Sequence, residues 1–345
     1  MVMELPLSNE QPWHDGRSGS SAGMVGRSEL IGRLQTRIAA VSARNSTVLI
    51  RGESGAGKGL VAMQIHQASS RASGPFISVD CTTLRDTLFE SQLFGHVKGA
   101  FTGAQQPTLG FWRAADGGTL FLDEVGELAP PMQAKLLRGL QDRAITPVGG
   151  VEPVPVDVRI IAATHRNLEE MVSRGEFRED LYFRLKVVRL DVPSLRERMM
   201  DVSALAWHFL KRLSDLYQEP AKSFAASAID AMMAYHWPGN VRELANAVEY
   251  AYVLSTSDVL TSADLPEEIR AAGIQRLVTS QNDAVVPLSV AERALILKAL
   301  HATRGNQARA AQLLQVERRR LYRKVRQYGL ESFASHRISP RGNSA

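Results

Sequence analysis

The sequence predicts an α/β domain built on a parallel sheet, followed by smaller helical domains. Short apolar runs rich in strand-forming residues alternate with helical or loop segments over the first half of the 345-residue chain. That alternation is typical of parallel strands covered by helices on both faces. After Asp191 the strand signals stop and helical segments replace them, which predicts a separate helical part.

The individual elements are predicted from residue composition and from the Pro and Gly residues that interrupt helices and strands. We expect strands over residues 47–51, 76–79, 119–122 and 158–163, and a helix over 60–69. Further helices are expected over 202–217, 225–235 and 241–254. The sequence Trp237-Pro238-Gly239-Asn240 separates the last two, because Pro and Gly interrupt helices.

The same signals divide the chain into six segments. A leader rich in Gly and Ser precedes the α/β domain, and a polar stretch without clear periodicity predicts a linker before the last helical unit. The predicted boundaries are leader 1–23, α/β domain 24–190, helical domain 191–272, linker 273–287, third helical unit 288–330 and basic tail 331–345.

Composition excludes several classes of protein. Apolar residues make up 44% and charged residues 22% of the chain, which is ordinary globular usage and not that of a disordered or fibrous protein. No run approaches the roughly 18 apolar residues of a membrane span, and residues 1–21 lack the apolar core of a secretory signal. Cys81 is the only cysteine, so no intrachain disulfide can form. We therefore expect a cytoplasmic protein without a membrane partner.

The net charge of +5 is unevenly distributed along the chain. Residues 301–345 carry ten Lys and Arg against two acids, whereas the preceding residues carry 31 basic and 34 acidic side chains. A nearly neutral body with a basic end predicts that any nucleic-acid contact is made by the C-terminal part. A solubilising tail is the alternative on charge alone.

A phosphate-loop pattern, G-x-x-x-x-G-K, follows the first predicted strand. Its glycines let backbone N–H groups turn toward phosphate oxygens, the next helix adds its positive N-terminus, and Lys58 neutralises the β- and γ-phosphates. A chance glycine-rich turn is the alternative. The Ser or Thr that usually follows the lysine and reaches Mg²⁺ is Gly59 here, so the cation must use another group. The predicted nucleotide-binding residues are Gly52, Glu53, Ser54, Gly55, Ala56, Gly57, Lys58 and Gly59.

Asp123 and Glu124 offer that group, because they end the apolar strand 119–122. Asp123 is placed to hold Mg²⁺, and Glu124 to polarise the attacking water as a general base. A solvated strand end is the alternative for such a pair. Together with the phosphate loop, the pair predicts a nucleotide hydrolase, and the lack of a guanine-specific signature favours ATP.

The basic C-terminal part has the spacing of a helix-turn-helix. Residues 308–314 predict a short helix, 315–317 a turn and 318–327 a second helix, which in this motif enters the major groove of double-stranded DNA. Most of its basic side chains should contact phosphates and a few should read bases. An anionic membrane or a solvated face are the alternatives, although the Leu321/Val325 spacing favours a packed unit. The predicted DNA-binding residues are Arg318, Arg319, Arg320, Tyr322, Arg323 and Lys324.

Several motifs together resemble the NtrC-type AAA+ family, the bacterial enhancer-binding proteins that activate sigma-54 RNA polymerase. Residues 99–104 match the family's GAFTGA loop at all six positions, and residues 90–96, 117–124, 177–185 and 237–244 resemble further family blocks. The C-terminal unit resembles a Fis-type helix-turn-helix. The resemblance implies an AAA+ P-loop NTPase core with a helical lid, and sigma-54 contact by Gly99, Ala100, Phe101, Thr102, Gly103 and Ala104.

The residues of this loop support a contact role by themselves. Small residues flank Phe101 and Thr102, which indicates a flexible tip with one large apolar side chain. The alternative is that Phe101 folds back into the core.

The resemblance also implies roles around the nucleotide. It makes Arg178, Arg184 or both into arginine fingers that reach the γ-phosphate of a neighbouring subunit. Fingers that act in trans imply a ring, a hexamer by family analogy, formed by this chain or with a paralogue. Surface ion pairs are the alternative for the arginines, and packing roles for the remaining residues. Those residues are Arg242 as sensor II, Thr164 and His165 as sensor I, and Val25 and Gly26 beside the adenine.

Two positions depart from the family pattern. Gly59 stands where the family usually has Glu or Asp, and Asp80 where it usually has an Asn that holds the catalytic glutamate until partner contact. An ionised carboxylate cannot donate a hydrogen bond to Glu124, and two ionised acids repel. We therefore predict altered coupling between partner contact and hydrolysis.

The sequence thus predicts an ATP- and Mg²⁺-dependent activator that binds upstream DNA and remodels sigma-54 RNA polymerase to drive open-complex formation. The alternative is a DNA-binding regulator that binds ATP, hydrolyses it poorly and acts with a partner subunit. Nothing long enough for a receiver or ligand-sensing domain precedes Met24. We therefore expect control by expression level, by a partner protein in trans or by a paired subunit.

Overall fold

The structure, a computed structural model, describes residues 23–82, 86–279, 288–303 and 305–330. The predicted basic tail, and the predicted leader apart from Gly23, lie outside the described residues. Contacts divide the chain into two units, Met1–Leu205 with Gly239–Arg242 and Ala206–Pro238 with Glu243–Ala345. The first unit therefore extends beyond residue 190, and it includes Gly239 and the first three residues of a later helix.

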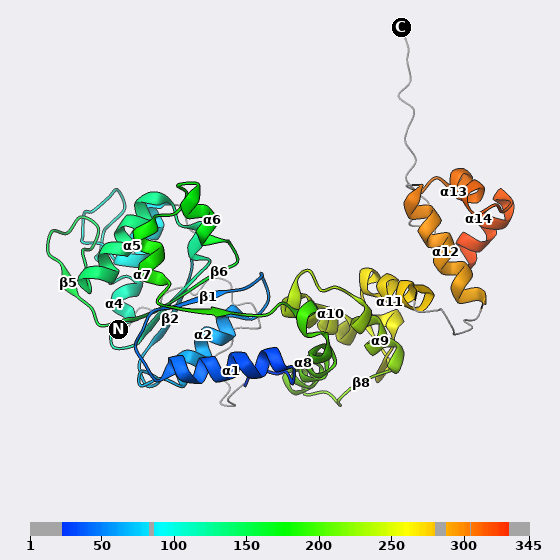
Figure 1. The fold of residues 1–345 in the computed structure, drawn as a ribbon, viewed down its shortest axis with the longest axis horizontal. Helices are drawn as coiled ribbons and strands as arrows, with labels where there is room; N and C mark the ends of the chain where they lie inside the picture. Colours follow the sequence, from blue (N-terminus) through cyan, green and yellow to red (C-terminus); the bar gives the residue numbers. More distant parts are fainter. Residues whose placement is uncertain (1–22, 83–85, 280–287, 304, 331–345) are drawn as a thin grey trace, which may run out of the picture. The chain divides into compact units, whose positions relative to one another are not determined.

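A five-stranded sheet forms the centre of the first unit (Figure 1). Its order is β2-β3-β6-β1-β7, and every pairing is parallel. The strands are β1 (Val48–Arg51), β2 (Phe76–Asp80), β3 (Thr119–Asp123), β6 (Arg159–Thr164) and β7 (Val188–Asp191). The predicted parallel sheet is confirmed. Sequence did not single out β7, whose four residues include two charged ones and give no apolar run.

Helices cover both faces of this sheet. In Figure 1, α1 and α2 lie on one side of the strands and α5 and α7 on the other. The helices of this unit are α1 (Glu29–Ser42), α2 (Lys58–Gln67), α3 (Asp86–Phe94), α4 (Phe111–Ala114), α5 (Pro130–Asp142), α6 (Leu168–Ser173) and α7 (Glu179–Leu185). Short 3-10 turns η1 (Val125–Glu127) and η2 (Leu195–Asp201) and a small hairpin of β4 (Ala144–Ile145) and β5 (Val154–Pro155) complete it.

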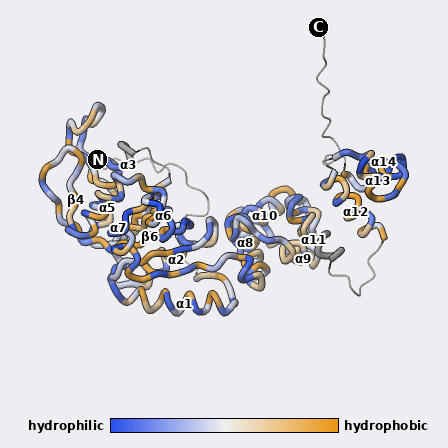
Figure 2. Tube along the Cα trace, turned by 45° about the horizontal axis from the view of Figure 1, so that its top comes forward, coloured by the Kyte–Doolittle hydropathy of each residue, from blue (hydrophilic) through white to orange (hydrophobic). Residues whose placement is uncertain are grey.

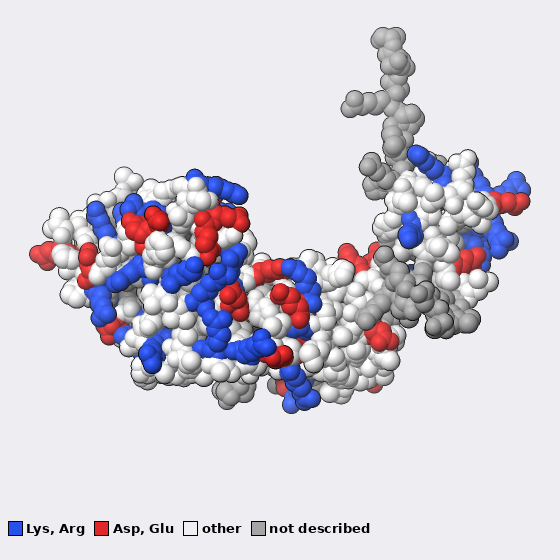
Figure 3. Space-filling view, viewed as in Figure 1, with Lys and Arg blue, Asp and Glu red and all other residues white. Residues whose placement is uncertain are grey.

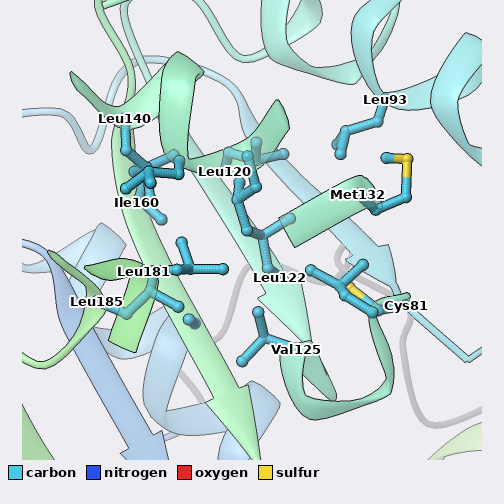
Figure 4. Packing of buried hydrophobic residues seen from close by; sticks show 14 of the residues in the cluster. Cys81, Leu93, Leu120, Leu122, Val125, Met132, Leu140, Ile160, Leu181 and Leu185 are labelled. Atoms are coloured by element: carbon cyan, nitrogen blue, oxygen red, sulfur yellow. The ribbon is translucent and has the colours of Figure 1, made fainter. Parts of the chain in front are cut away.

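Two hydrophobic clusters hold these layers together. Val48 and Ile50 of β1 pack with α1 and α2, whereas Leu49 between them packs on the opposite face, as the alternation of a strand requires. Helix α1 shows the matching pattern of apolar and polar stretches along its length (Figure 2). On the other face, Leu181 and Leu185 of α7 reach the side chains of the strands (Figure 4). Both faces of the sheet are therefore buried, so functional polar side chains are expected at the ends of its strands.

The second unit contains a helical part with a small core. Its elements are most of α8 (Val202–Tyr217), α9 (Ala226–Ala234), most of α10 (Asn240–Leu254), α11 (Glu267–Thr279), η3 (Ser262–Asp264) and a two-stranded pair, β8 (Ser223–Phe224) with β9 (Val259–Leu260). Trp237 is fully buried and its Nε1 donates to Met232 O at 2.9 Å. Helix α11 continues to Thr279, through residues that sequence placed in a linker starting at 273. The polar composition there hid a helix whose residues lack a clear apolar period.

Three helices close the described chain: α12 (Leu288–Ala302), α13 (Gln307–Leu313) and α14 (Arg318–Gln327). Leu300, Leu321 and Val325 lie in their shared core. Asn306 caps α13 by accepting from Arg309 N at 3.2 Å, and Gln315 turns the chain with a φ of 52°. The predicted helix-turn-helix is confirmed. Among the helices in the described part of the chain, none has the length and apolarity to cross a membrane.

Candidate functional site

The phosphate loop lies between β1 and α2 in the first unit. Gly55 and Gly57 have φ values of 73° and 106°, which strain other residues, and a side chain on Gly55 would meet Gly239 O at 2.3 Å. Lys58 is the first residue of α2 and is buried; its Nζ donates to Gly52 O at 3.1 Å and to Glu53 O at 3.3 Å. The loop therefore points a lysine ammonium and the N-terminus of a ten-residue helix at one place.

Glu124 follows β3 directly and has a partner on each carboxylate oxygen. Its Oε1 lies 2.9 Å from Lys58 Nζ, and its Oε2 accepts from the backbone N of His165 at 3.0 Å and lies 2.7 Å from the ring Nδ1 of His165. Burial alone would raise the pKa of Glu124, but the hydrogen bonds from Lys58 and His165 outweigh it and lower that pKa. Glu124 is therefore an anchored, ionised carboxylate.

Asp123, the last residue of β3, differs from its neighbour. Its Oδ1 accepts from Glu124 N at 3.0 Å. Burial raises the pKa of Asp123; Lys58 partly offsets that effect, and the charges of Glu124 and Asp80 add to it. A cation placed here would relieve this cost, because it favours the ionised carboxylate.

These residues fit a nucleoside triphosphate with Mg²⁺. Lys58 and the turn before α2 supply donors for phosphate oxygens. In the described residues no cluster of three or more His, Cys, Asp or Glu side chains could hold a metal by itself. Mg²⁺ commonly binds through one or two carboxylates together with substrate phosphates and water, and Asp123 next to the phosphate loop matches that mode.

Side chains from distant parts of the sequence brace the phosphate loop. Glu53 accepts from Asn240 Nδ2 at 3.1 Å and from Arg196 Nη1 at 3.0 Å, and Arg198 Nη2 donates to Ala56 O at 3.0 Å. Arg242 Nη1 donates to Ser54 Oγ at 3.2 Å. Asn240 and Arg242 lie in the family block 237–244, whereas Arg196 and Arg198 had no assigned role, because their contacts with Glu53 and Ala56 are tertiary.

The segment before α1 is also fixed in the first unit. Asp201 accepts from Arg27 N at 2.7 Å and from Ser28 N at 2.9 Å, directly after Val25 and Gly26. A cavity of about 590 Å³ lies beside the phosphate loop, between α1 and residues 191–197, and Gly52, Glu53 and His165 line part of it. This space is available next to the predicted nucleotide site.

The two sensor I candidates point in different directions. Thr164 is buried at the end of β6, where its Oγ1 accepts from Arg166 N at 3.0 Å. His165 is exposed and contacts Glu124, as described above. The structure thus brings His165, and not the Thr164 hydroxyl, into contact with the proposed base.

Arg178 is the N-cap residue of α7 and Arg184 belongs to the helix, and in the described residues neither contacts its own chain's phosphate loop. Arg178 Nη2 pairs with Asp180 Oδ2 at 2.7 Å, and Arg184 Nη2 donates to Leu140 O at 3.1 Å. Both side chains are exposed. These contacts leave the guanidinium groups on the surface, where a second molecule can reach them.

The GAFTGA loop, residues 99–104, projects from the first unit. Gly99 N donates to Ala104 O at 2.9 Å and closes the loop at its base. Phe101 is 40% exposed, with its ring centroid 5.0 Å from that of His96, and Thr102 is exposed beside it. The interior of the protein therefore does not take up Phe101, and the loop presents an aromatic and a hydroxyl side chain at its tip.

Helix α14 presents a basic surface (Figure 3). Tyr322 is 62% exposed among its arginines. Lys324 differs from the other candidates, because it is half-buried and its Nζ pairs with Glu292 Oε2 of α12 at 2.7 Å. Tyr328 OH donates to the same oxygen at 2.8 Å. The exposed candidate side chains are Arg318, Arg319, Arg320, Tyr322 and Arg323.

Three family models match consecutive segments of the chain. A family model described as Sigma-54 interaction domain matches residues 24–191. An AAA+ ATPase lid domain model matches residues 196–281, and a model described as Bacterial regulatory protein, Fis family, matches residues 287–328.

Similar proteins cover most of the chain. Transcriptional regulatory protein ZraR of Salmonella typhimurium is 46% identical over 308 residues, which are 89% of this chain and 69% of that protein. Regulatory protein AtoC of Escherichia coli is 43% identical and covers 85% of this chain and 65% of its own length. The crystal structure of NtrX from Brucella abortus in complex with ATP has a TM-score of 0.67 and 35% identity, over 89% of this chain and 69% of that chain.

An α/β unit with a phosphate loop, a matched sigma-54 interaction domain and a Fis-type helix-turn-helix occur together in this chain. The predicted fold class is confirmed, and the AAA+ models indicate an ATPase. The chain therefore belongs to the sigma-54-dependent bacterial enhancer-binding proteins, and it is an ATP-dependent transcriptional activator.

Proposed function

We propose that this chain couples ATP hydrolysis at Lys58, Asp123 and Glu124 to open-complex formation by sigma-54 RNA polymerase. The observation that carries the proposal is the 2.9 Å pair between Lys58 and Glu124, in the same unit as the exposed Phe101 of the GAFTGA loop. The Lys58–Glu124 pair provides a base beside a phosphate-binding lysine, and the exposed Phe101 provides a surface for the polymerase.

Each residue at the site has its own task in this proposal. Bound Mg²⁺ supplies charge neutralisation at the β- and γ-phosphates, and Asp123 would hold it. Lys58 donates to phosphate oxygens. His165 keeps Oε2 of Glu124 in place. The other oxygen, Oε1, then accepts a proton from water once Lys58 turns to phosphate.

The arginines of α7 complete the site from a neighbouring subunit. Arg178 and Arg184 are exposed and make no contact with the phosphate loop of their own chain in the described residues. A guanidinium that stabilises charge on the transferred phosphoryl group is worth about 10³–10⁵ in rate. We therefore propose a ring, a hexamer, as the active species.

The other predicted site residues bind DNA, sigma-54 and the nucleotide in this proposal. Helix α14 binds upstream double-stranded DNA through its exposed arginines, and the loop tip contacts sigma-54 with Phe101 and Thr102. Adenine lies near Val25 and Gly26, and Thr164 and Arg242 respond to the nucleotide from the strand end and from the start of α10.

Two variants test the coupling. Glu124→Gln keeps the shape of the side chain but removes the base, so phosphate release should fall by about 10²-fold or more while ATP affinity is retained. Thr102→Ala should keep phosphate release and lose open-complex formation. Full hydrolysis by the Gln variant, or full activation by the Ala variant, would contradict the proposal.

A second candidate function is a regulator that binds ATP with little turnover. Gly59 and Asp80, which replace residues usual in the family, favour it. The same phosphate-release assay separates the two. If the unaltered chain releases phosphate no faster than its Glu124→Gln variant, while binding ATP and DNA, this second function replaces the first.

A further inference from the structure

One carboxylate ties the helix that carries Arg178 and Arg184 to the central sheet. Glu169, the second residue of α6, accepts through Oε1 from Tyr182 OH at 2.7 Å, from Lys186 Nζ at 3.2 Å and from Arg189 Nη1 at 3.3 Å. Its Oε2 lies 3.8 Å from Arg51 Nη1. A single side chain therefore gathers one hydroxyl and three cations.

The partners of Glu169 come from three other elements. Arg51 is the last residue of β1 and directly precedes Gly52 of the phosphate loop. Tyr182 belongs to α7 and Lys186 caps its C-terminus, while Arg189 belongs to β7. Glu169 itself lies four residues after His165, which contacts Glu124. The cluster thus joins the strand before the phosphate loop to the helix of the proposed arginine fingers.

The cluster includes the hydroxyl of Tyr182, a buried residue, and this hydroxyl needs a hydrogen-bond partner. Tyr182 is only 5% exposed, so its hydroxyl needs a protein acceptor. Glu169 provides it, and the hydrogen bond from Tyr182 is the main reason why the pKa of Glu169 is lowered to about 2. Lys186 also lies over the Tyr182 ring, 4.9 Å from its centroid. Arg178, at the N-cap of α7, and Phe183 and Arg184 within the helix are exposed.

We propose that Glu169 is a positioning residue that sets the orientation of α7 and, through it, the presentation of Arg178 and Arg184 to a neighbouring subunit. This inference rests on the proposed function, because it requires arginines that act in trans. Neutralising Glu169 leaves the phosphate loop, Asp123 and Glu124 intact but loosens the tie that holds the finger helix to β1 and β7.

A subunit-mixing experiment tests the inference. Lys58→Ala subunits supply arginines without a working phosphate loop, and Arg178→Ala/Arg184→Ala subunits supply the loop without arginines. Mixing the two should recover ATP hydrolysis. Adding Glu169→Gln to the arginine-supplying subunit should lower the recovered rate about 5-fold or more with KM for ATP unchanged, because one missing positioning contact removes part of the 10³-fold or larger finger effect. In the loop-supplying subunit the same substitution should change the rate by less than about 2-fold.

The neighbouring carboxylate gives a matched control. Glu170 pairs at 3.7 Å with Arg174 of the turn that ends its own helix and accepts from Asn167 at 2.6 Å, so Glu170→Gln in the arginine-supplying subunit should leave recovery unchanged. Tyr182→Phe removes the hydrogen bond from α7 to Glu169. It should lower the recovered rate in the arginine-supplying subunit and not in the loop-supplying subunit. Circular dichroism of each variant shows whether it folds.

The outcomes separate this inference from the proposed function. If the mixture of Lys58→Ala and Arg178→Ala/Arg184→Ala subunits recovers no hydrolysis, the arginines do not act in trans. The proposed function is then contradicted, and so is the role of Glu169. If this mixture recovers hydrolysis but Glu169→Gln lowers it equally in either subunit, or in neither, the positioning role alone is overturned. An equal loss with Glu170→Gln would also overturn it.

Discussion

Lys58 forms an ion pair with Glu124, with 2.9 Å between Nζ and Oε1. The ammonium that meets phosphate and the carboxylate proposed as the base are thus each other's partners. Because phosphate competes for the same ammonium, nucleotide binding would free one oxygen of Glu124 while His165 keeps the other in place. In the proposed function, binding of the triphosphate and exposure of the base are therefore linked through one contact.

Removing the imidazole of His165 tests whether it orients the base. His165→Ala leaves only the backbone N–H on Oε2 of Glu124, so the turnover number for ATP should fall about 10-fold, a modest part of general-base catalysis. KM should change little. His165→Asn places an amide donor near the position of Nδ1 and should restore most of the rate in a phosphate-release assay. Equal losses in both variants, or a loss confined to KM, would contradict an orienting role.

Replacing Asp80 tests the departure from the family pattern. Asp80 Oδ1 accepts from Thr82 N at 2.8 Å and from Thr82 Oγ1 at 2.7 Å, and Asp80 lies in register with Asp123 on the neighbouring strand. Asp80→Asn keeps an acceptor for Thr82 and removes a negative charge that raises the pKa of Asp123. Basal phosphate release, or its response to sigma-54, should change by more than about 2-fold. If both stay constant, position 80 does not govern coupling.

Protonation of Glu169 should weaken the first unit at low pH. The pKa of Glu169 is lowered from its ordinary 4.5 to about 2, mainly by the hydrogen bond from Tyr182. Because the pKa of Glu169 is lower in the folded state than in the unfolded state, its ionised form stabilises the fold. This contribution is complete above pH 4.5 and disappears as the pH falls toward 2. The side chain of Glu169 is 40% exposed, so solvent screening limits the effect at pH 7 to about 1 kcal/mol.

Urea unfolding of the native chain and of Glu169→Gln at pH 7, 5, 4 and 3 measures this linkage. The difference in free energy of unfolding should be largest at pH 7 and should shrink as the pH falls below about 4.5. Glu170→Gln is the control, since its ion pair with Arg174 is long and exposed. A difference between the native chain and Glu169→Gln that does not depend on pH would mean that the substitution disturbs packing and not charge.

Sequence predicted the parts of the molecule that are encoded locally. The strand–loop–helix order around Lys58 and the two acids at the end of β3 depend on short patterns, and both lie where those patterns indicate. Strand β7 was missed because Val188-Arg189-Leu190-Asp191 has no apolar run and forms only by pairing with β1. Tertiary contacts of this kind carry too little local signal to be found without a structure.

The site shows the same division. Arg196 and Asn240 brace Glu53 across more than 140 residues of sequence, and no spacing rule connects them. Lys324 looked like the other basic residues of its helix. Its position between Leu321 and Tyr328 turns it toward Glu292 of α12, which only the packed helices reveal.

The contrast between Lys324 and the arginines of α14 leads to a prediction about DNA binding. Arg319 and Arg323 are exposed and lie one helical turn apart on α14. Loss of a phosphate contact by Arg323→Ala should weaken DNA binding and reduce the slope of log K against log salt by about 0.9. Lys324→Ala should leave that slope nearly unchanged, because Lys324 already pairs with Glu292, and should lower thermal stability of the C-terminal helices instead. Fluorescence anisotropy of the full chain with duplex DNA at several salt concentrations, beside thermal unfolding, distinguishes these results. A larger loss of slope for Lys324→Ala than for Arg323→Ala would mean that Lys324 leaves Glu292 to reach the DNA backbone.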